Sequence, residues 1–139
     1  MKTIALLLGM LISSFIAKAQ DSEGITISVT IENVMNSEGD ILVALHSQDT
    51  FMKGLGIQNL KENAEKGEVT FSFTNVQPGT YAISSLHDLN KNQQMDFEDN
   101  GMPKEDYAMS GSSSPMGPPT FEDVKFEVKE EDMELKLRF

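Results

Sequence analysis

Apolar and polar residues alternate along much of the chain, a pattern that predicts β-strands with one buried face. The alternating segments are 25–31, 68–73 and 133–139, and the more continuously apolar ones are 41–45 and 80–86. Turn-forming residues occupy 36–40 (Asn-Ser-Glu-Gly-Asp) and separate the first two strands. We therefore expect 25–31 and 41–45 to form an antiparallel hairpin.

The remaining segments complete an all-β pattern. Residues 47–66 interrupt the alternation, and we expect them to cover a sheet edge, with a short helical turn at 59–65. Apolar residues spaced along 121–128 predict another strand, and the alternation at the end makes Phe139 a core residue. Six or seven short strands in this length indicate an antiparallel two-sheet sandwich with one long polar loop, residues 88–119.

The first residues resemble a secretory signal. Lys2 precedes an apolar run from Ile4 to Phe15, and Ala17 and Ala19 are small residues suited to cleavage before Gln20. The run is shorter than the ~20 residues that a membrane-spanning helix needs. We expect a signal peptide at 1–19, a single domain at 20–139, and a periplasmic or secreted product; the alternative is an uncleaved anchor.

The net charge of the chain limits the kinds of partner that can bind it. The formal net charge is −11, and removal of residues 1–19 with their two lysines makes it −13. Such a surface repels phosphate backbones and anionic headgroups, so we expect neither nucleic-acid binding nor insertion into a membrane after cleavage. Divalent cations and basic partners are favoured. The absence of cysteine excludes disulfides and thiolate-bound metals.

The long loop begins with the spacing of a calcium-binding loop. If Asp88 is position one, oxygen-bearing side chains fall at three, five, nine and twelve, and the main-chain carbonyl of position seven also faces inward in such loops. The predicted ligands are Asp88, Asn90, Asn92, Gln94 through its carbonyl, Asp96 and Asp99. Calcium takes six to eight oxygens in irregular geometry, so carboxylates and amides on a loop suit it.

Two positions depart from that calcium pattern. Position six is Gln93 where glycine is usual, and position twelve is Asp99 where a longer glutamate is usual. Glu105 or Asp106, from the following residues, is a candidate to complete the shell. The alternative is an ion-free turn held by hydrogen bonds from side chain to backbone.

Two enzyme-like arrangements also need to be weighed. His46 and His87 lie near strand ends, where with Asp88 they could form a zinc site, although histidines that only cap strands are more common. Ser84, Ser85 and the serines at 110–114, with His87 and Asp88, offer the residue types of a Ser-His-Asp arrangement, but no Gly-x-Ser-x-Gly elbow is present. We expect a non-catalytic protein.

Several motifs together resemble the bacterial domain of unknown function 2141. They are Pro78-Gly79-x-Tyr81-Ala82, His87-Asp88-x-Asn90-x-Asn92-x-x-x-Asp96, Gly101-x-Pro103-x-Glu105-x-Tyr107-x-x-Ser110 and Pro119-x-Phe121-Glu122. The resemblance implies a small exported protein with no assigned activity. It also implies glycines where this chain has Lys91 and Gln93 in the loop, and where it has Asp106 and Ala108 further on. More distantly, the Pro-Gly-x-Tyr turn is similar to Ig-like and transthyretin-like or carboxypeptidase-regulatory-like sandwiches.

The sequence thus predicts an exported interaction module with a structural calcium loop and an unknown protein or glycan partner at the cell envelope. One alternative is a metal-free accessory domain of the envelope. The other is a hydrolase or metalloenzyme that uses His87.

Overall fold

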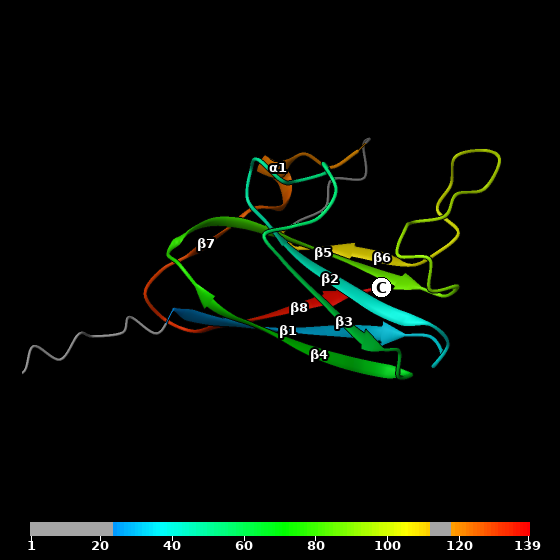
Figure 1. Ribbon diagram of the computed structural model, residues 1–139, viewed down its shortest axis with the longest axis horizontal. Helices are drawn as coiled ribbons and strands as arrows, with labels where there is room; N and C mark the ends of the chain where they lie inside the picture. The colour runs from blue at the N-terminus through cyan, green and yellow to red at the C-terminus, as the bar shows by residue number, and fades with distance from the viewer. Residues whose placement is uncertain (1–23, 112–117) are drawn as a thin grey trace, which may run out of the picture.

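Two β-sheets pack face to face, and the apolar sides of their strands form the layer between them (Figure 1). The computed structural model describes residues 24–111 and 118–139, so the predicted signal peptide at 1–19 lies outside the described residues. The all-β two-sheet prediction is confirmed, with eight strands instead of six or seven. Among the described residues, no helix has the length and apolarity to cross a membrane.

Sheet A has the strand order β4–β1–β8, and sheet B has the order β3–β2–β5–β6, with β7 paired to β5. The strands are β1 (Ile25–Val34), β2 (Asp40–His46), β3 (Gln58–Asn63), β4 (Gly67–Val76), β5 (Gly79–Asp88), β6 (Tyr107–Met109), β7 (Phe126–Val128) and β8 (Met133–Arg138). Between β6 and β7, α1 (Phe121–Val124) makes a single helical turn.

The core follows from the alternation of apolar residues. On β1, Ile27, Val29 and Ile31 are fully buried, and on β4 Phe71 and Phe73 face the same layer. Sheet B contributes the buried side chains of Ile41, Val43, Leu45 and Ile83. Each fully buried side chain of this size contributes about 1.5–3 kcal/mol relative to an exposed one.

The predicted hairpin of 25–31 with 41–45 is wrong. β1 pairs with β4 and β8, whereas β2 pairs with β3 and β5, so the turn at 36–40 carries the chain from sheet A to sheet B. Pairing is also not antiparallel throughout, because β8 runs parallel to β1 with Ile27 opposite Met133. Alternation shows which face of a strand is buried but carries no information on its neighbour.

Three segments differ from their predicted structures, the first being β6, a strand that lies within the predicted polar loop 88–119. The expected helical turn at 59–65 is instead the edge strand β3, whose residues are mostly exposed and so show no apolar alternation. The expected strand at 121–128 begins as α1, where the Asp123 carboxylate accepts hydrogen bonds from the Thr120 hydroxyl and N–H. These bonds lower the pKa of Asp123. At the end of the chain, Phe139 is half-buried and packs against the core.

A second, smaller apolar cluster lies on the outer face of sheet B. Phe51, Ala82 and Val124 are buried there, with Met109 and Phe121 packed against them. The loop 47–57 and α1 therefore cover one end of this face, and the loop 89–106 rises at the other end (Figure 1). The sandwich thus carries two loops on the same side of sheet B.

Candidate functional site

Asp88 ends β5 and is the most deeply buried acidic residue of the candidate site. It lies directly opposite Asp40 of β2, and the two side chains are 0% and 6% exposed. Lys91 and Lys61 approach the Asp40 carboxylate at 3.7 and 4.0 Å. Among the described residues no lysine or arginine pairs with Asp88, although a buried charge ordinarily has a basic partner or a metal.

The chain after Asp88 winds around its carboxylate. The N–H of Asn92 donates to Asp88 Oδ1 at 3.2 Å, and the N–H of Gln93 donates to Oδ2 at 2.7 Å. Each carboxylate oxygen thus accepts one hydrogen bond. Because a carboxylate offers about four acceptor positions, this one retains capacity for another donor or for a cation.

Asp96 binds the side chains of two earlier loop residues, Asn90 and Asn92. Its carboxylate accepts hydrogen bonds from the side-chain amide of Asn90 at 2.7 Å and from that of Asn92 at 3.0 Å. The amide oxygens of the same two residues accept main-chain N–H groups from Asn92 and Gln94. Four predicted ligands, Asp88, Asn90, Asn92 and Asp96, are therefore joined in one hydrogen-bonded group.

Glu105 ties the two ends of the loop together. It is 6% exposed, and its two carboxylate oxygens accept the N–H groups of Leu89 at 3.0 Å and Asp96 at 3.2 Å. An open pocket of about 330 Å³ lies here, lined by Leu89, Asn90, Asp96, Phe97, Lys104 and Glu105. The sequence named Glu105 only as an alternative with Asp106; a buried glutamate among exposed neighbours is the feature that distinguishes it.

The other two predicted ligands, Gln94 and Asp99, differ in how they lie relative to this hydrogen-bonded group. Gln94 follows the wound part of the loop, and its N–H is bonded to Asn92 Oδ1. Asp99 is exposed in the turn of a short hairpin, which the bridge between Phe97 and Pro103 closes. No hydrogen bond joins Asp99 to the other ligands within the described part of the chain.

The loop is anchored to the turn between the sheets. Gly39 has a φ of +71°, and a Cβ at this position would overlap the carbonyl oxygen of Asp88. The preceding residue of the turn, Glu38, accepts a hydrogen bond from His87 Nε2 at 2.7 Å through its carbonyl. The start of the loop is therefore held in place by contacts with this turn.

The family comparison matches residues 29–136 to the family described as "Uncharacterized protein conserved in bacteria (DUF2141)". The chain belongs to the DUF2141 family. No curated protein and no solved structure matched the chain. The match covers both sheets and the whole Asp88–Asp96 loop.

Two positions of the loop in this DUF2141 chain have a backbone conformation that favours glycine. Lys91 and Gln93 have φ of +57° and +62°, the left-handed region in which glycine is favoured. The resemblance implied glycines at these two positions. This DUF2141 chain adopts the left-handed conformation with larger side chains, at an energetic cost of about 1–2 kcal/mol for each.

The enzyme-like arrangements are not assembled among the residues of this DUF2141 chain that the structure describes. In the β2–β5 pair His46 lies opposite Ala82, and His87 lies opposite Ile41 at the other end, so the two histidines cannot share a metal. The His87 ring is buried and stacks on Phe139, while Asp88 faces the opposite side of the sheet, so these two residues do not form the pair that a Ser-His-Asp arrangement needs. Three of the candidate serines, at 112–114, lie outside the described residues.

His46 makes a contact that sequence reasoning missed. Its Nε2 lies 3.1 Å from Ser84 Oγ and its Nδ1 lies 3.3 Å from Thr50 Oγ1, so it joins the loop 47–57 to sheet B. Burial lowers the pKa of His46, which favours the neutral ring. No carboxylate bonds to this ring among the described residues, and the contact is that of an anchor for the loop.

Proposed function

We propose that this protein is an exported, non-catalytic interaction module whose loop from Asp88 to Asp96 binds calcium. The observation that carries the proposal is the Asp88 carboxylate. It is fully buried, opposite a second carboxylate, and among the described residues it is held by two main-chain N–H groups and no basic side chain. A cation between Asp88 and Asp96 would offset the cost of burying this charge.

The ligands of the proposed ion follow from the loop. Asp88 and Asp96 provide carboxylates, Asn90 and Asn92 provide amide oxygens, and Gln94 provides its carbonyl. Glu105 lies next to the group and is better placed than the exposed Asp99 to complete it. The role of the ion is structural: it would fix the loop on the outer side of sheet B.

The number of acidic ligands at the site determines the calcium affinity that we expect. Within residues 24–111 and 118–139, no three His, Asp or Glu side chains are arranged to hold a metal by themselves. Calcium would therefore depend on amide and main-chain oxygens as well as carboxylates. We expect a dissociation constant of about 10⁻⁴–10⁻³ M, the range of extracellular calcium modules.

One observation favours a second candidate, a metal-free accessory domain. The amide N–H groups of Asn90 and Asn92 already point at the Asp96 carboxylate and satisfy it. The loop is therefore closed by its own hydrogen bonds. Calcium binding requires both amides to rotate so that their oxygens face the ion.

Titration calorimetry on residues 20–139 distinguishes these two candidates. Calcium should bind with a stoichiometry of one, and Asp88→Asn should abolish binding because it removes the buried charge. Asp99→Asn is the matched control and should leave the affinity within about a factor of three, since this side chain is exposed. Absence of saturable heat with calcium would favour the metal-free domain.

A further inference from the structure

The middle of the outer face of sheet B is uncovered and apolar. Residues directly opposite on paired strands share a face, so Leu42, Leu86 and Tyr107 form one row and Ala44, Ser84 and Met109 the next. Tyr107 is 47% exposed and the side chains of Leu42 and Leu86 are half-buried. We call these two rows the open strip.

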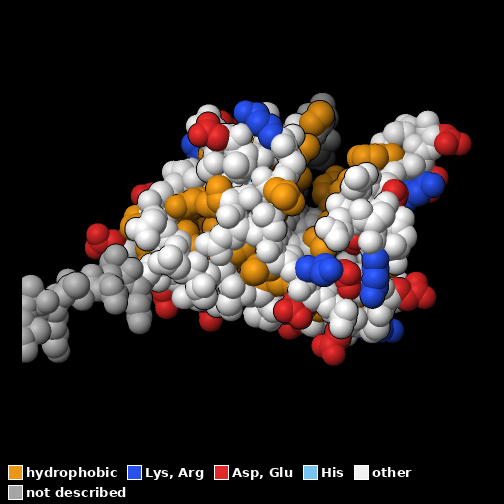
Figure 2. All heavy atoms as spheres, viewed as in Figure 1, with side chains coloured by type: hydrophobic (Ala, Val, Ile, Leu, Met, Phe, Trp, Pro, Cys, Tyr) orange, Lys and Arg blue, Asp and Glu red, His pale blue; other side chains and the backbone are white. Residues whose placement is uncertain are grey.

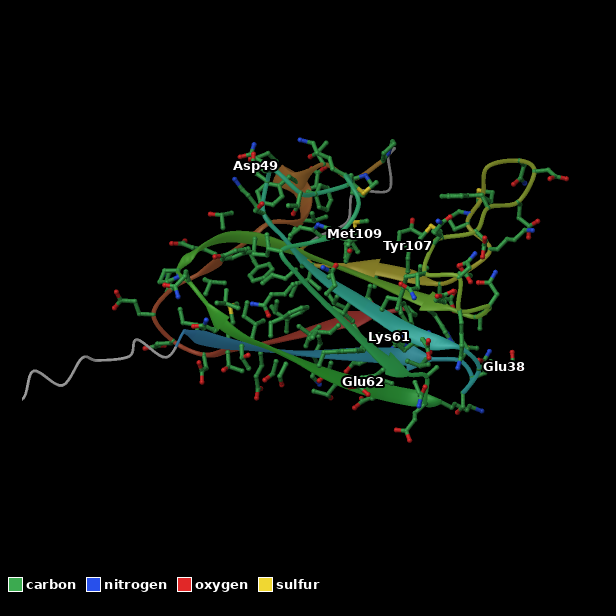
Figure 3. The ribbon with its side chains drawn as sticks, viewed as in Figure 1. Glu38, Asp49, Lys61, Glu62, Tyr107 and Met109 are labelled. Carbon is green, nitrogen blue, oxygen red and sulfur yellow. The ribbon has the colours of Figure 1, made fainter. Side chains whose placement is uncertain are left out.

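The two loops beside the open strip, together with Tyr107 within it, carry most of the large apolar side chains that are exposed among the described residues. Of the eight large apolar side chains exposed among the described residues, seven belong to the segments 52–57 and 89–107. On the first segment they are Met52, Leu55 and Ile57, and on the second they are Leu89, Phe97, Met102 and Tyr107. Figure 2 shows apolar side chains exposed in the hollow between these loops, and Figure 3 shows Met109 and Tyr107 along β6 between them.

This distribution is typical of a protein-binding surface. A contiguous apolar patch with a polar rim marks an interaction site, whereas single exposed apolar residues are ordinary. Methionine and aromatic residues are enriched at the centres of such sites, and methionine adapts its shape to a partner. Among the described residues, the one large apolar side chain exposed outside these segments is Met35, which serves as a reference.

The charge of the segments around the open strip indicates which kind of partner would bind there. The segments 47–57 and 89–106 contain six acidic residues against three lysines, and one of these lysines, Lys91, pairs with Asp40. The whole chain has a net charge of −11, which disfavours a second copy of itself and an anionic membrane. A partner complementary to this surface is therefore basic as well as apolar.

We propose that the open strip is the docking site for an extended basic segment of a partner protein, with apolar side chains that alternate with lysine or arginine. In an extended peptide successive side chains point to opposite sides, so every second residue faces the strip. Its apolar residues contact Leu86, Met109 and Tyr107, and its basic residues reach acidic side chains of the flanking loops such as Asp49. This inference names the partner chemistry of the interaction module proposed above.

The test uses two heptapeptides that differ only in charge, Lys-Leu-Lys-Val-Lys-Leu-Lys and Glu-Leu-Glu-Val-Glu-Leu-Glu. Each is titrated into ¹⁵N-labelled residues 20–139 at about 0.15 M salt, where long-range attraction is screened. The basic peptide should bind saturably and shift the amide signals of β5, β6 and the residues near Met52. The acidic peptide should bind at least tenfold more weakly.

Two variants locate the contact. Met52→Ser combined with Tyr107→Ser should weaken binding of the basic peptide at least tenfold, because both side chains are about half or more exposed, Tyr107 within the strip and Met52 on a loop beside it. Met35→Ser, which removes an equally exposed methionine, should change the affinity less than twofold. Melting curves of the variants separate a lost contact from a lost fold.

Titrations in calcium and in EDTA keep this proposal separate from the calcium proposal. Saturable, strip-centred binding of the basic peptide in EDTA supports the docking site even if calcium does not bind. The proposal is overturned by equal binding of both peptides, by shifts spread over sheet A, or by an unchanged affinity in the double variant. Self-association through the strip, seen as concentration-dependent sedimentation, also overturns it.

Discussion

The interior between the sheets and the layer of loops outside sheet B are built in different ways. The interior consists of alternating apolar residues such as Ile27, Val29 and Phe73, all fully buried, and any well-packed apolar set would serve there. The outer layer depends on individual contacts, among them Asp88 with two N–H groups and His46 with two hydroxyls. Stability therefore resides mainly in the first region, whereas the functions that we propose belong to the second.

The largest expected difference between the two regions comes from one phenylalanine in each. Phe73→Ala should lower the free energy of unfolding by about 3–5 kcal/mol, because Phe73 is fully buried and its loss leaves a cavity. Phe97→Ala should change it by no more than about 0.5 kcal/mol, since Phe97 is 56% exposed. Urea unfolding of both variants measures this difference, and similar losses of unfolding free energy would contradict the assignment of stability to the interior.

A second comparison tests the junction between the regions. Gly39 and Gly101 both have positive φ, but only at Gly39 would a Cβ meet backbone, that of Asp88 and Leu89. Gly101→Ala should cost about 1 kcal/mol from backbone strain alone. Gly39→Ala should cost about 2–3 kcal/mol, because the root of the loop also has to move. Equal losses in thermal unfolding would show that the turn does not support the loop.

The strands were predictable from sequence because alternation is a local property. Their pairing was not, since the turn at 36–40 reads like a hairpin turn and instead connects two sheets. β3 was missed because an exposed edge strand needs no apolar side chains. Similarly, the parallel contact of β8 with β1 depends on residues more than 100 positions apart.

The candidate site was predictable in part, because the spacing of its residues is also a local property of the sequence. The spacing from Asp88 to Asp96 indicated which side chains would converge, because a loop of that length brings alternate residues to one side. Asp99 did not join them, as a separate hairpin from Phe97 to Pro103 intervenes. Glu105 joins the loop through a fold of the chain that no local pattern reveals.

A smaller effect is expected from the left-handed positions of the loop. Gln93→Gly should raise the free energy of unfolding by up to about 1 kcal/mol, because glycine adopts the observed φ of +62° without steric cost. Gln94→Gly is the control, and it should lower stability slightly, as Gln94 is not among the residues with positive φ. Destabilisation by Gln93→Gly in chemical unfolding would contradict the strain assigned to this residue.

The smallest expected effect concerns pH and the anchor of the loop 47–57. Because burial lowers the pKa of His46 in the folded state, the unfolded chain takes up this proton first as the pH falls. The contribution of His46 to stability is present above its ordinary pKa of 6.5 and is lost as the pH falls below that value. His46→Gln should therefore flatten the stability profile between about pH 7 and about pH 5. Parallel profiles for the two proteins would exclude this role.

The central claim is that calcium binds within the loop from Asp88 to Asp96, and two-dimensional NMR of the ¹⁵N-labelled domain tests it directly. Saturating calcium should shift the side-chain amide signals of Asn90 and Asn92 together with the main-chain signals of residues 88–96, and leave the interior strands unchanged. The same solution should raise the free energy of unfolding by ~2.7 kcal/mol at a hundredfold excess over the dissociation constant. Unmoved asparagine amides, or weak shifts scattered over the acidic surface, would contradict the claim.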